Sequence, residues 1–136
     1  MAFKSYLALY GLSALAFVAI DFVWLGLVAP GFYQKHLGHI LRPEFLKVPA
    51  ILFYAVFIAG VLVFAVLPGL AADSLVRTMA LGAFLGFFAY ATFDLTSMAL
   101  IEGFPWIVVF VDLTWGTVLT ASVAAAGFGF GRWLGF

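Results

Sequence analysis

The stretch that decides the fold runs from Tyr90 to Gly116 and reads YATFDLTSMALIEGFPWIVVFVDLTWG. It is long, apolar and aromatic, yet it contains the tripeptide Asp-Leu-Thr twice, at 94–96 and at 112–114. A third aspartate, Asp21, lies in an earlier apolar run within DFVWLG, which is similar to DLTWG at 112–116. A carboxylate inside a membrane-length apolar run is energetically expensive. We therefore interpret the rest of the chain as a scaffold that brings three aspartates together.

The composition is that of an integral membrane protein with one domain over residues 1–136. The hydrophobic fraction is 67% and the mean hydropathy is +1.24, whereas soluble domains have roughly 45–50% apolar residues. The net charge is zero and no basic run is present, which argues against a nucleic-acid partner. The chain has no cysteine, so it has no disulfide, thiolate metal site, thiol nucleophile or haem attachment motif. We predict no cofactor.

The apolar runs predict an all-α, integral membrane four-helix bundle. Each run has about the 20 residues that a spanning helix needs, and the first continues too far for a cleaved signal peptide. Pro30-Gly31 and Pro68-Gly69 are expected to end the first two spans, with a short helix at about 33–41 in the first loop and a frayed tail after 127. Four spans place both termini on the same side of the membrane. We expect the spans at about 5–29, 48–67, 77–100 and 106–128.

The depths and faces of the aspartates support one shared site. At a rise of 1.5 Å per residue, all three aspartates lie roughly 9–14 Å inside the surface formed by the first and third loops, and Tyr54 lies at about that depth. Gly82 and Gly86 recur at four-residue spacing with Tyr90 and Asp94. Small residues on the same helical stripe as a carboxylate indicate that this stripe packs against protein. Residues 112, 116, 120 and 124 form a similar stripe on the fourth span.

Two interpretations of the aspartates remain open. As packing groups they would form interhelical hydrogen bonds worth only about 0.6–2 kcal/mol each, against a cost of about 2.5–3.5 kcal/mol for an aspartate at mid-membrane. As a functional site, with no lysine or arginine inside the membrane, either at least one carboxyl is protonated or a cation or basic ligand is held there. A weaker alternative is that Lys35, Arg42 or Lys47 reaches down to the acids from the first loop. The predicted site residues are Asp94 and Asp112 as principal acids, Asp21 as the third acid, Tyr54, Tyr90 and Thr96 as tuning groups, and Trp24 and Trp115 as apolar walls.

Metal binding and catalysis have weaker support in the sequence. His36 and His39 are spaced so that both face one side of a helix, but two histidines without a fixed third ligand are a weak metal signal. A joint metal site with the aspartates requires the first loop to fold back over the bundle. No base is placed beside a serine or threonine hydroxyl, so no catalytic dyad is identified. We therefore lean against an enzyme.

The motifs resemble those of the bacterial predicted membrane proteins grouped as domain of unknown function 2177, over nearly the whole chain. They are Asp21-x-x-Trp24-Leu25-Gly26, Tyr33 followed by Leu37-Gly38, Pro49-Ala50 with Phe53-Tyr54, Tyr90-x-Thr92-x-Asp94-Leu95-Thr96, and Asp112-x-x-Trp115-Gly116. In that family an asparagine usually follows the threonine of Asp-Leu-Thr, whereas this chain has Ser97, which loses an amide but keeps a hydroxyl. The resemblance implies a four-helix protein of the bacterial inner membrane and implies no activity.

Three functions remain open. The leading one is an intramembrane carboxylate site that binds a proton, a cation or a small polar or cationic ligand, without a pore through the opposite half of the bundle. The second is an accessory subunit of a larger membrane complex, and the third is a membrane enzyme acting on a lipid. The expected partners are the lipid bilayer, and a second copy of the chain or a larger complex. Three basic residues on each side of the membrane leave the orientation undecided and allow inverted copies to pair.

Overall fold

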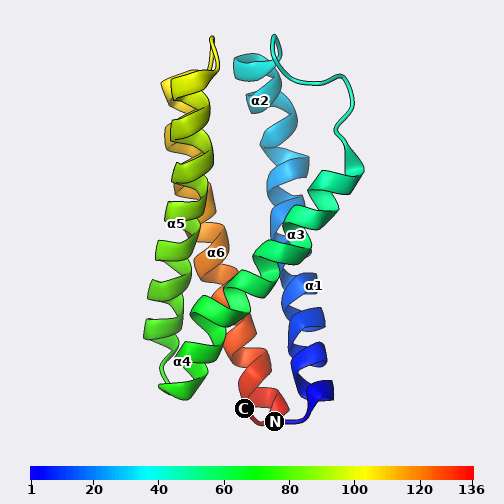
Figure 1. Cartoon of the computed structure of the whole chain (residues 1–136), viewed down its shortest axis with the longest axis vertical. Coiled ribbons are helices and arrows are strands. Elements are labelled where there is room, and N and C mark those ends of the chain that lie inside the picture. Colours follow the sequence, from blue (N-terminus) through cyan, green and yellow to red (C-terminus); the bar gives the residue numbers. More distant parts are fainter.

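The computed structural model describes all 136 residues and contains only helices, turns and loops. Four helical rods are long and apolar enough to cross a membrane, which confirms the predicted all-α membrane bundle. Both termini lie at one end of the bundle (Figure 1), and the rings of Tyr6 and Phe136 are 5.1 Å apart there. The helices are α1 (Phe3–Leu27), α2 (Ala29–Leu37), α3 (Lys47–Val61), the π-helical turn η1 (Leu62–Val66), α4 (Leu67–Ala71), α5 (Leu75–Leu100) and α6 (Trp106–Leu134).

At Pro30-Gly31 the helical path is interrupted, but a second helix begins almost at once. The rod α1 stops at Leu27, and α2 begins at Ala29 with Pro30 in its first turn, where the missing N–H of proline leaves no partner unsatisfied. The short helix predicted at 33–41 therefore begins earlier and continues the direction of α1 toward the loop end of the bundle (Figure 1).

The second proline signal does not end the second span, contrary to our expectation. The N–H of Leu67 donates to the carbonyl of Leu62, five residues back, and this wider π-helical turn leads into α4, which has Pro68 in its first turn. Gly69 then packs against α5, since a Cβ on it would lie 1.7 Å from the Thr78 hydroxyl oxygen. Close packing of this turn on α5 compensates for the proline, so the helix continues to Ala71.

The predicted frayed tail is also wrong, because α6 continues to Leu134. Two of the glycines in GFGFG pack closely against η1 and α4. A Cβ on Gly127 would lie 2.7 Å from Val66, and one on Gly131 would lie 2.4 Å from Leu70. These glycines therefore allow close helix packing and are not a sign of disorder.

The helices α5 and α6 run antiparallel (Figure 1) and have the most extensive contact of any two helices in the bundle. A Cβ on Gly82 would lie 2.7 Å from the Cβ of Ala124, and one on Gly86 would lie 2.5 Å from the hydroxyl oxygen of Thr120. The predicted small-residue stripes therefore do face each other. This contact fixes the register of the two helices that carry Asp-Leu-Thr.

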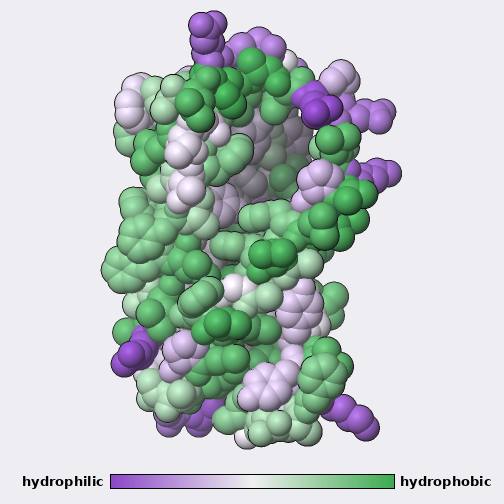
Figure 2. Space-filling view, in the orientation of Figure 1, coloured by the Kyte–Doolittle hydropathy of each residue, from purple (hydrophilic) through white to green (hydrophobic).

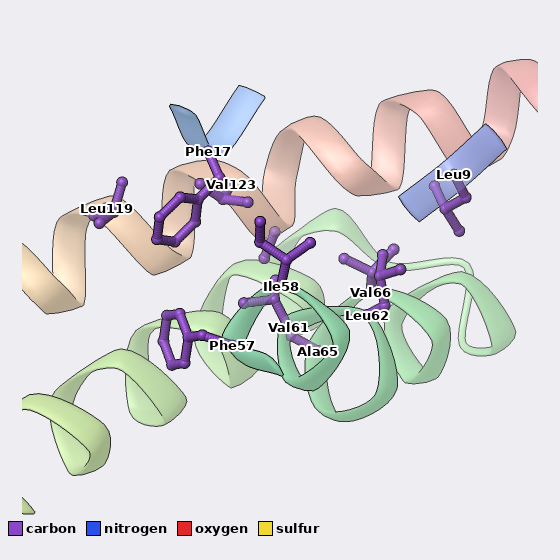
Figure 3. Close-up of a cluster of buried hydrophobic side chains, with 11 residues drawn as sticks. Leu9, Phe17, Phe57, Ile58, Val61, Leu62, Ala65, Val66, Leu119 and Val123 are labelled. Atoms are coloured by element: carbon purple, nitrogen blue, oxygen red, sulfur yellow. The ribbon is translucent and has the colours of Figure 1, made fainter. Parts of the chain in front are cut away.

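The apolar core occupies the half of the bundle near the termini. Figure 3 shows its side chains converging from α1, α3, η1 and α6. The outer surface is a broad apolar belt with hydrophilic groups at its two ends (Figure 2), as expected for a chain surrounded by lipid. The core residues are Leu9, Phe17, Phe57, Ile58, Val61, Leu62, Ala65, Val66, Leu119, Val123 and Ala124.

Candidate functional site

A hollow of about 550 Å³ lies in the other half of the bundle, between α1, α3, α5 and α6. Its surface is mainly aromatic, and two carboxylates are the only acidic groups in it. The lining residues are Asp21, Trp24, Leu25, Tyr33, Phe53, Tyr54, Ala89, Tyr90, Phe93, Asp112 and Trp115.

Asp21 belongs to α1 and is held by two neighbouring helices. The Tyr54 hydroxyl on α3 donates a hydrogen bond to its Oδ2, and the Trp115 indole N–H on α6 donates to its Oδ1 over 3.3 Å. Only 7% of Asp21 is exposed. The two donors satisfy part of the hydrogen-bonding capacity of a carboxylate, which accepts at both oxygens.

Asp112 belongs to α6 and is held by a residue from the short helix α2. The Tyr33 hydroxyl donates to its Oδ1, and the Trp24 indole N–H donates to the Tyr33 oxygen over 3.3 Å. Burial first, and then the hydrogen bond to Asp112, raise the pKa of Tyr33 well above that of an ordinary tyrosine. Tyr33 therefore stays a neutral donor at physiological pH.

We did not predict the contact between Tyr33 and Asp112. The two residues are 79 positions apart in the chain. The available signal was the position of Tyr33 in a short helix directly after the first span, where it can still reach the beginning of the fourth span.

Trp24 and Trp115 stack with ring centroids 4.6 Å apart and planes 8° from parallel. Both follow an aspartate by three positions, so on each helix the acid and the indole share one face. The pairing is crossed between helices: Trp115 of α6 donates to Asp21 of α1, and Trp24 of α1 donates to the tyrosine that holds Asp112. A second hollow of about 320 Å³ includes both indoles in its lining, together with Phe110, Val111, Thr114 and Val118.

Asp94 is fully buried, and its oxygens have no hydrogen-bonding neighbour other than the acid Asp112. The register of α5 and α6 places it beside Asp112. A Cβ on Gly116 would lie 2.3 Å from the Tyr90 ring, and one helical turn further along the two antiparallel helices Asp94 faces Asp112. Two acids therefore lie side by side in the protein interior, and only Asp112 lines the hollow.

One predicted group, Thr96, has a different position from the one we expected. Tyr90 lines the hollow, as do Tyr54 and both tryptophans. Thr96 does not join them: it is exposed, and its hydroxyl donates to the Thr92 carbonyl of its own helix. Two positions beyond Asp94, a helical side chain points to the opposite face, so Thr96 faces away from the site.

The two histidines lie at the loop end of the bundle and not in the hollow. The His36 ring packs at 4.8 Å from Phe32, and the Nε2 atom of His39 is 3.1 Å from the carbonyl oxygen of Gly103. No three His, Asp or Glu side chains come together in an arrangement that would hold a metal ion. The joint metal site of His36, His39 and the three aspartates is therefore not formed.

A second apolar cluster packs α2 against the beginning of α6 and closes the loop end above the hollow. It consists of Leu37, Phe104, Val108 and Val109, with Tyr33 and Met98 among the side chains packed against it. The one ion pair of the structure, Arg132 with Asp73, lies near the termini and is exposed. No lysine or arginine therefore neutralises the acids of the hollow.

The fold and the site together define a small membrane-spanning helical bundle with a polar cluster in an aromatic hollow. The chain belongs to the family described as "Predicted membrane protein (DUF2177)", whose profile matches residues 6–129. This match agrees with the resemblance noted from the motifs. Searches among curated proteins and among solved structures give no match.

Proposed function

We propose that the hollow binds a small molecule through a cationic group, and that Asp21 and Asp112 are the acids that pair with it. One observation carries this proposal. Two buried carboxylates line an aromatic hollow of about 550 Å³, and no basic side chain pairs with either of them. Buried charge requires compensation, so a cation from outside the chain is the natural partner.

The lining suits an ammonium group better than a bare metal ion. Metal ions such as Mg²⁺ and Ca²⁺ take about six or more oxygen ligands, and only two carboxylates line this space. An ammonium group is attracted both by carboxylates and by the faces of tryptophan, tyrosine and phenylalanine rings. The volume also lies within the roughly 300–1,000 Å³ of small-molecule pockets.

Asp94 supports a binding site over a purely structural role for the acids. If the three aspartates served packing alone, each would be expected to have a donor. Asp94 has no donor apart from the neighbouring acid Asp112, although Asp21 and Asp112 each accept a hydrogen bond from a tyrosine. A buried acid beside Asp112 is a suitable place for a proton that leaves or returns when a cation binds next to it.

The opposite half of the bundle favours binding without passage through the membrane. That half is filled by the apolar core around Phe17, Val61 and Leu119. The buried polar side chains there are only the hydroxyls of Ser13, Thr78 and Thr120, and the Thr78 hydroxyl donates to the carbonyl of Ser74. We propose a binding or half-channel role in the bacterial inner membrane. We also propose a second copy of the chain, or a larger membrane complex, as a partner.

The test is binding of ethylammonium to the purified protein in detergent, measured by thermal unfolding and by calorimetry. We expect saturable stabilisation that is lost in both Asp21→Asn and Asp112→Asn, because the substituted amides are neutral. Glu102→Gln is the matched control, since Glu102 is an exposed acid in the third loop. Equal responses in the wild type and both site variants would contradict the proposal.

A further inference from the structure

The hollow is bordered on one side by two helices that diverge. The first turns of α3 stand apart from α5, and the gap narrows toward η1 (Figure 1). The turn η1 packs along α5, and the Phe57 ring near the end of α3 lies 6.5 Å from the Tyr90 ring of α5. Figure 2 shows the surface hollowed in this half of the molecule.

The rim of this gap is apolar and lies at the depth of the membrane. Phe53 of α3 is 45% exposed and Phe93 of α5 is 63% exposed, and both line the hollow. Leu25 also lines it and is 42% exposed. None of these side chains carries charge, so they suit contact with acyl chains. We call the gap between Phe53 and Phe93 the lateral opening.

The end of the bundle above the hollow is covered. Tyr33 of α2 is hydrogen-bonded to Asp112, and Leu37 packs with Phe104 and Val108. His39 adds a contact between the first and third loops through Gly103. A molecule dissolved in the bilayer thus has a more direct route to the acids than one in the water above α2.

We infer that the ligand is a membrane-dissolved amphiphile with a cationic ammonium headgroup and an alkyl tail, which reaches Asp21 and Asp112 through the lateral opening. The headgroup lies between the acids and the aromatic walls, and the tail passes out between Phe53 and Phe93. Charge complementarity selects this occupant, because the acids have no basic partner in the chain and an anionic headgroup would be repelled. The inference rests on the proposed function and adds the ligand class and the route.

The experiment closes the lateral opening covalently. The chain has no cysteine, so Phe53→Cys with Phe93→Cys gives a unique thiol pair that a cleavable bis-maleimide can bridge. Both positions are exposed, so folding should be retained. The matched control is Phe84→Cys with Phe88→Cys, whose rings are 6.2 Å apart on the outer face of α5. Protein is reconstituted in nanodiscs, and Trp106 and Trp133 are replaced by phenylalanine, which leaves the two site tryptophans as the fluorescent reporters.

Dodecylammonium, ethylammonium and neutral dodecanol are the probes, and the rate and extent of the tryptophan fluorescence change are the readouts. We expect bridging of 53 and 93 to slow dodecylammonium binding by at least about tenfold, and cleavage of the bridge to restore it. Bridging of 84 and 88 leaves the rate unchanged. Neutral dodecanol gives no tryptophan fluorescence change that is lost in Asp21→Asn or Asp112→Asn.

The outcomes separate the two proposals. If ethylammonium binds in an aspartate-dependent manner but dodecylammonium binds no tighter, or is not slowed by the bridge, the amphiphile and its route are wrong and the cation site stands. If neither amine gives an aspartate-dependent signal, the proposed function itself fails, and the inference with it.

Discussion

Trp24 and Trp115 stack face to face between antiparallel helices, and each indole donates toward the acid of the other helix. Asp21 and Asp112 are thereby held through partners on other elements. The stack also borders both the main hollow and the smaller one of about 320 Å³. The pair is therefore a wall of the site and a link between α1 and α6.

We predict that Trp115→Phe keeps an aromatic wall but weakens binding of the cationic ligand. The substitution removes the indole donor to Asp21, which alters the position of that carboxylate. A hydrogen bond to a charged group contributes about 1.5–3 kcal/mol, so we expect roughly a tenfold or larger loss of ethylammonium affinity by calorimetry. Trp106→Phe is the control, since Trp106 is exposed at the start of α6. Equal affinities in the two variants would show that the indole N–H plays no part.

We predict that Gly86→Ala destabilises the bundle, because the added Cβ would lie 2.2 Å from the backbone oxygen of Gly116. Backbone must move to relieve this contact, and overpacking of this kind costs about 1–3 kcal/mol or more. Gly11→Ala is the matched control, with nothing within 4 Å of its added Cβ and a gain of about 1 kcal/mol in helix propensity. Thermal unfolding in detergent compares them, and a Gly86 variant as stable as the Gly11 variant would contradict the register.

We predict that Asp94→Asn folds and is at least as stable as the wild type. The carboxyl of Asp94 is buried with no donor except the neighbouring acid Asp112, and two buried acids side by side carry a large desolvation cost that a neutral amide lowers. Asp112→Asn is the comparison, because it changes a group that accepts from Tyr33. The measurement is the unfolding temperature of each variant. Loss of folding in Asp94→Asn would instead identify Asp94 as a packing group.

We predict that Tyr33→Phe changes the alkaline stability of the protein. The pKa of Tyr33 is raised in the folded state, so the folded chain retains this proton when the unfolded chain loses it at about pH 10. The contribution of Tyr33 is therefore complete below about pH 10 and falls as the pH rises toward its folded-state pKa. Urea unfolding from pH 8 to 11 should show a shallower decline for Tyr33→Phe. Parallel curves for the variant and the wild type would contradict the burial of the phenol.

The pairing of Asp94 with Asp112 follows from features that the sequence displays. The Asp-Leu-Thr repeat marks both acids, and Gly82 and Gly86 mark the face on which α5 meets α6. Four-residue spacing aligns these positions on one stripe, and the structure packs the two stripes together. Helical periodicity alone is enough to predict that both acids point inward.

Thr96 and Tyr33 show where sequence reasoning was insufficient. Thr96 was assigned to the site because it lies in the same tripeptide as Asp94, yet it faces outward. The contact of Tyr33 with Asp112 was not predicted, and it joins α2 to a residue of α6 that lies 79 positions later in the chain. For Thr96, the helical rotation between positions 94 and 96 already predicts an outward-facing side chain, but the repeated tripeptide was given more weight. For Tyr33, the contact depends on how α2 packs against the beginning of α6, which local pattern does not specify.

The sequence by itself determined the apolar spans, the three acids within them and the small-residue faces, because these depend on composition and on the 3.6-residue period of a helix. Only the tertiary structure decided the crossed contacts of Trp24 and Trp115, the absence of a tyrosine or tryptophan donor to Asp94, and the lateral opening between Phe53 and Phe93. These features arise from the tilt and register of helices that are distant in the chain. They are set by many small packing contacts acting together, and no single stretch of sequence contains them.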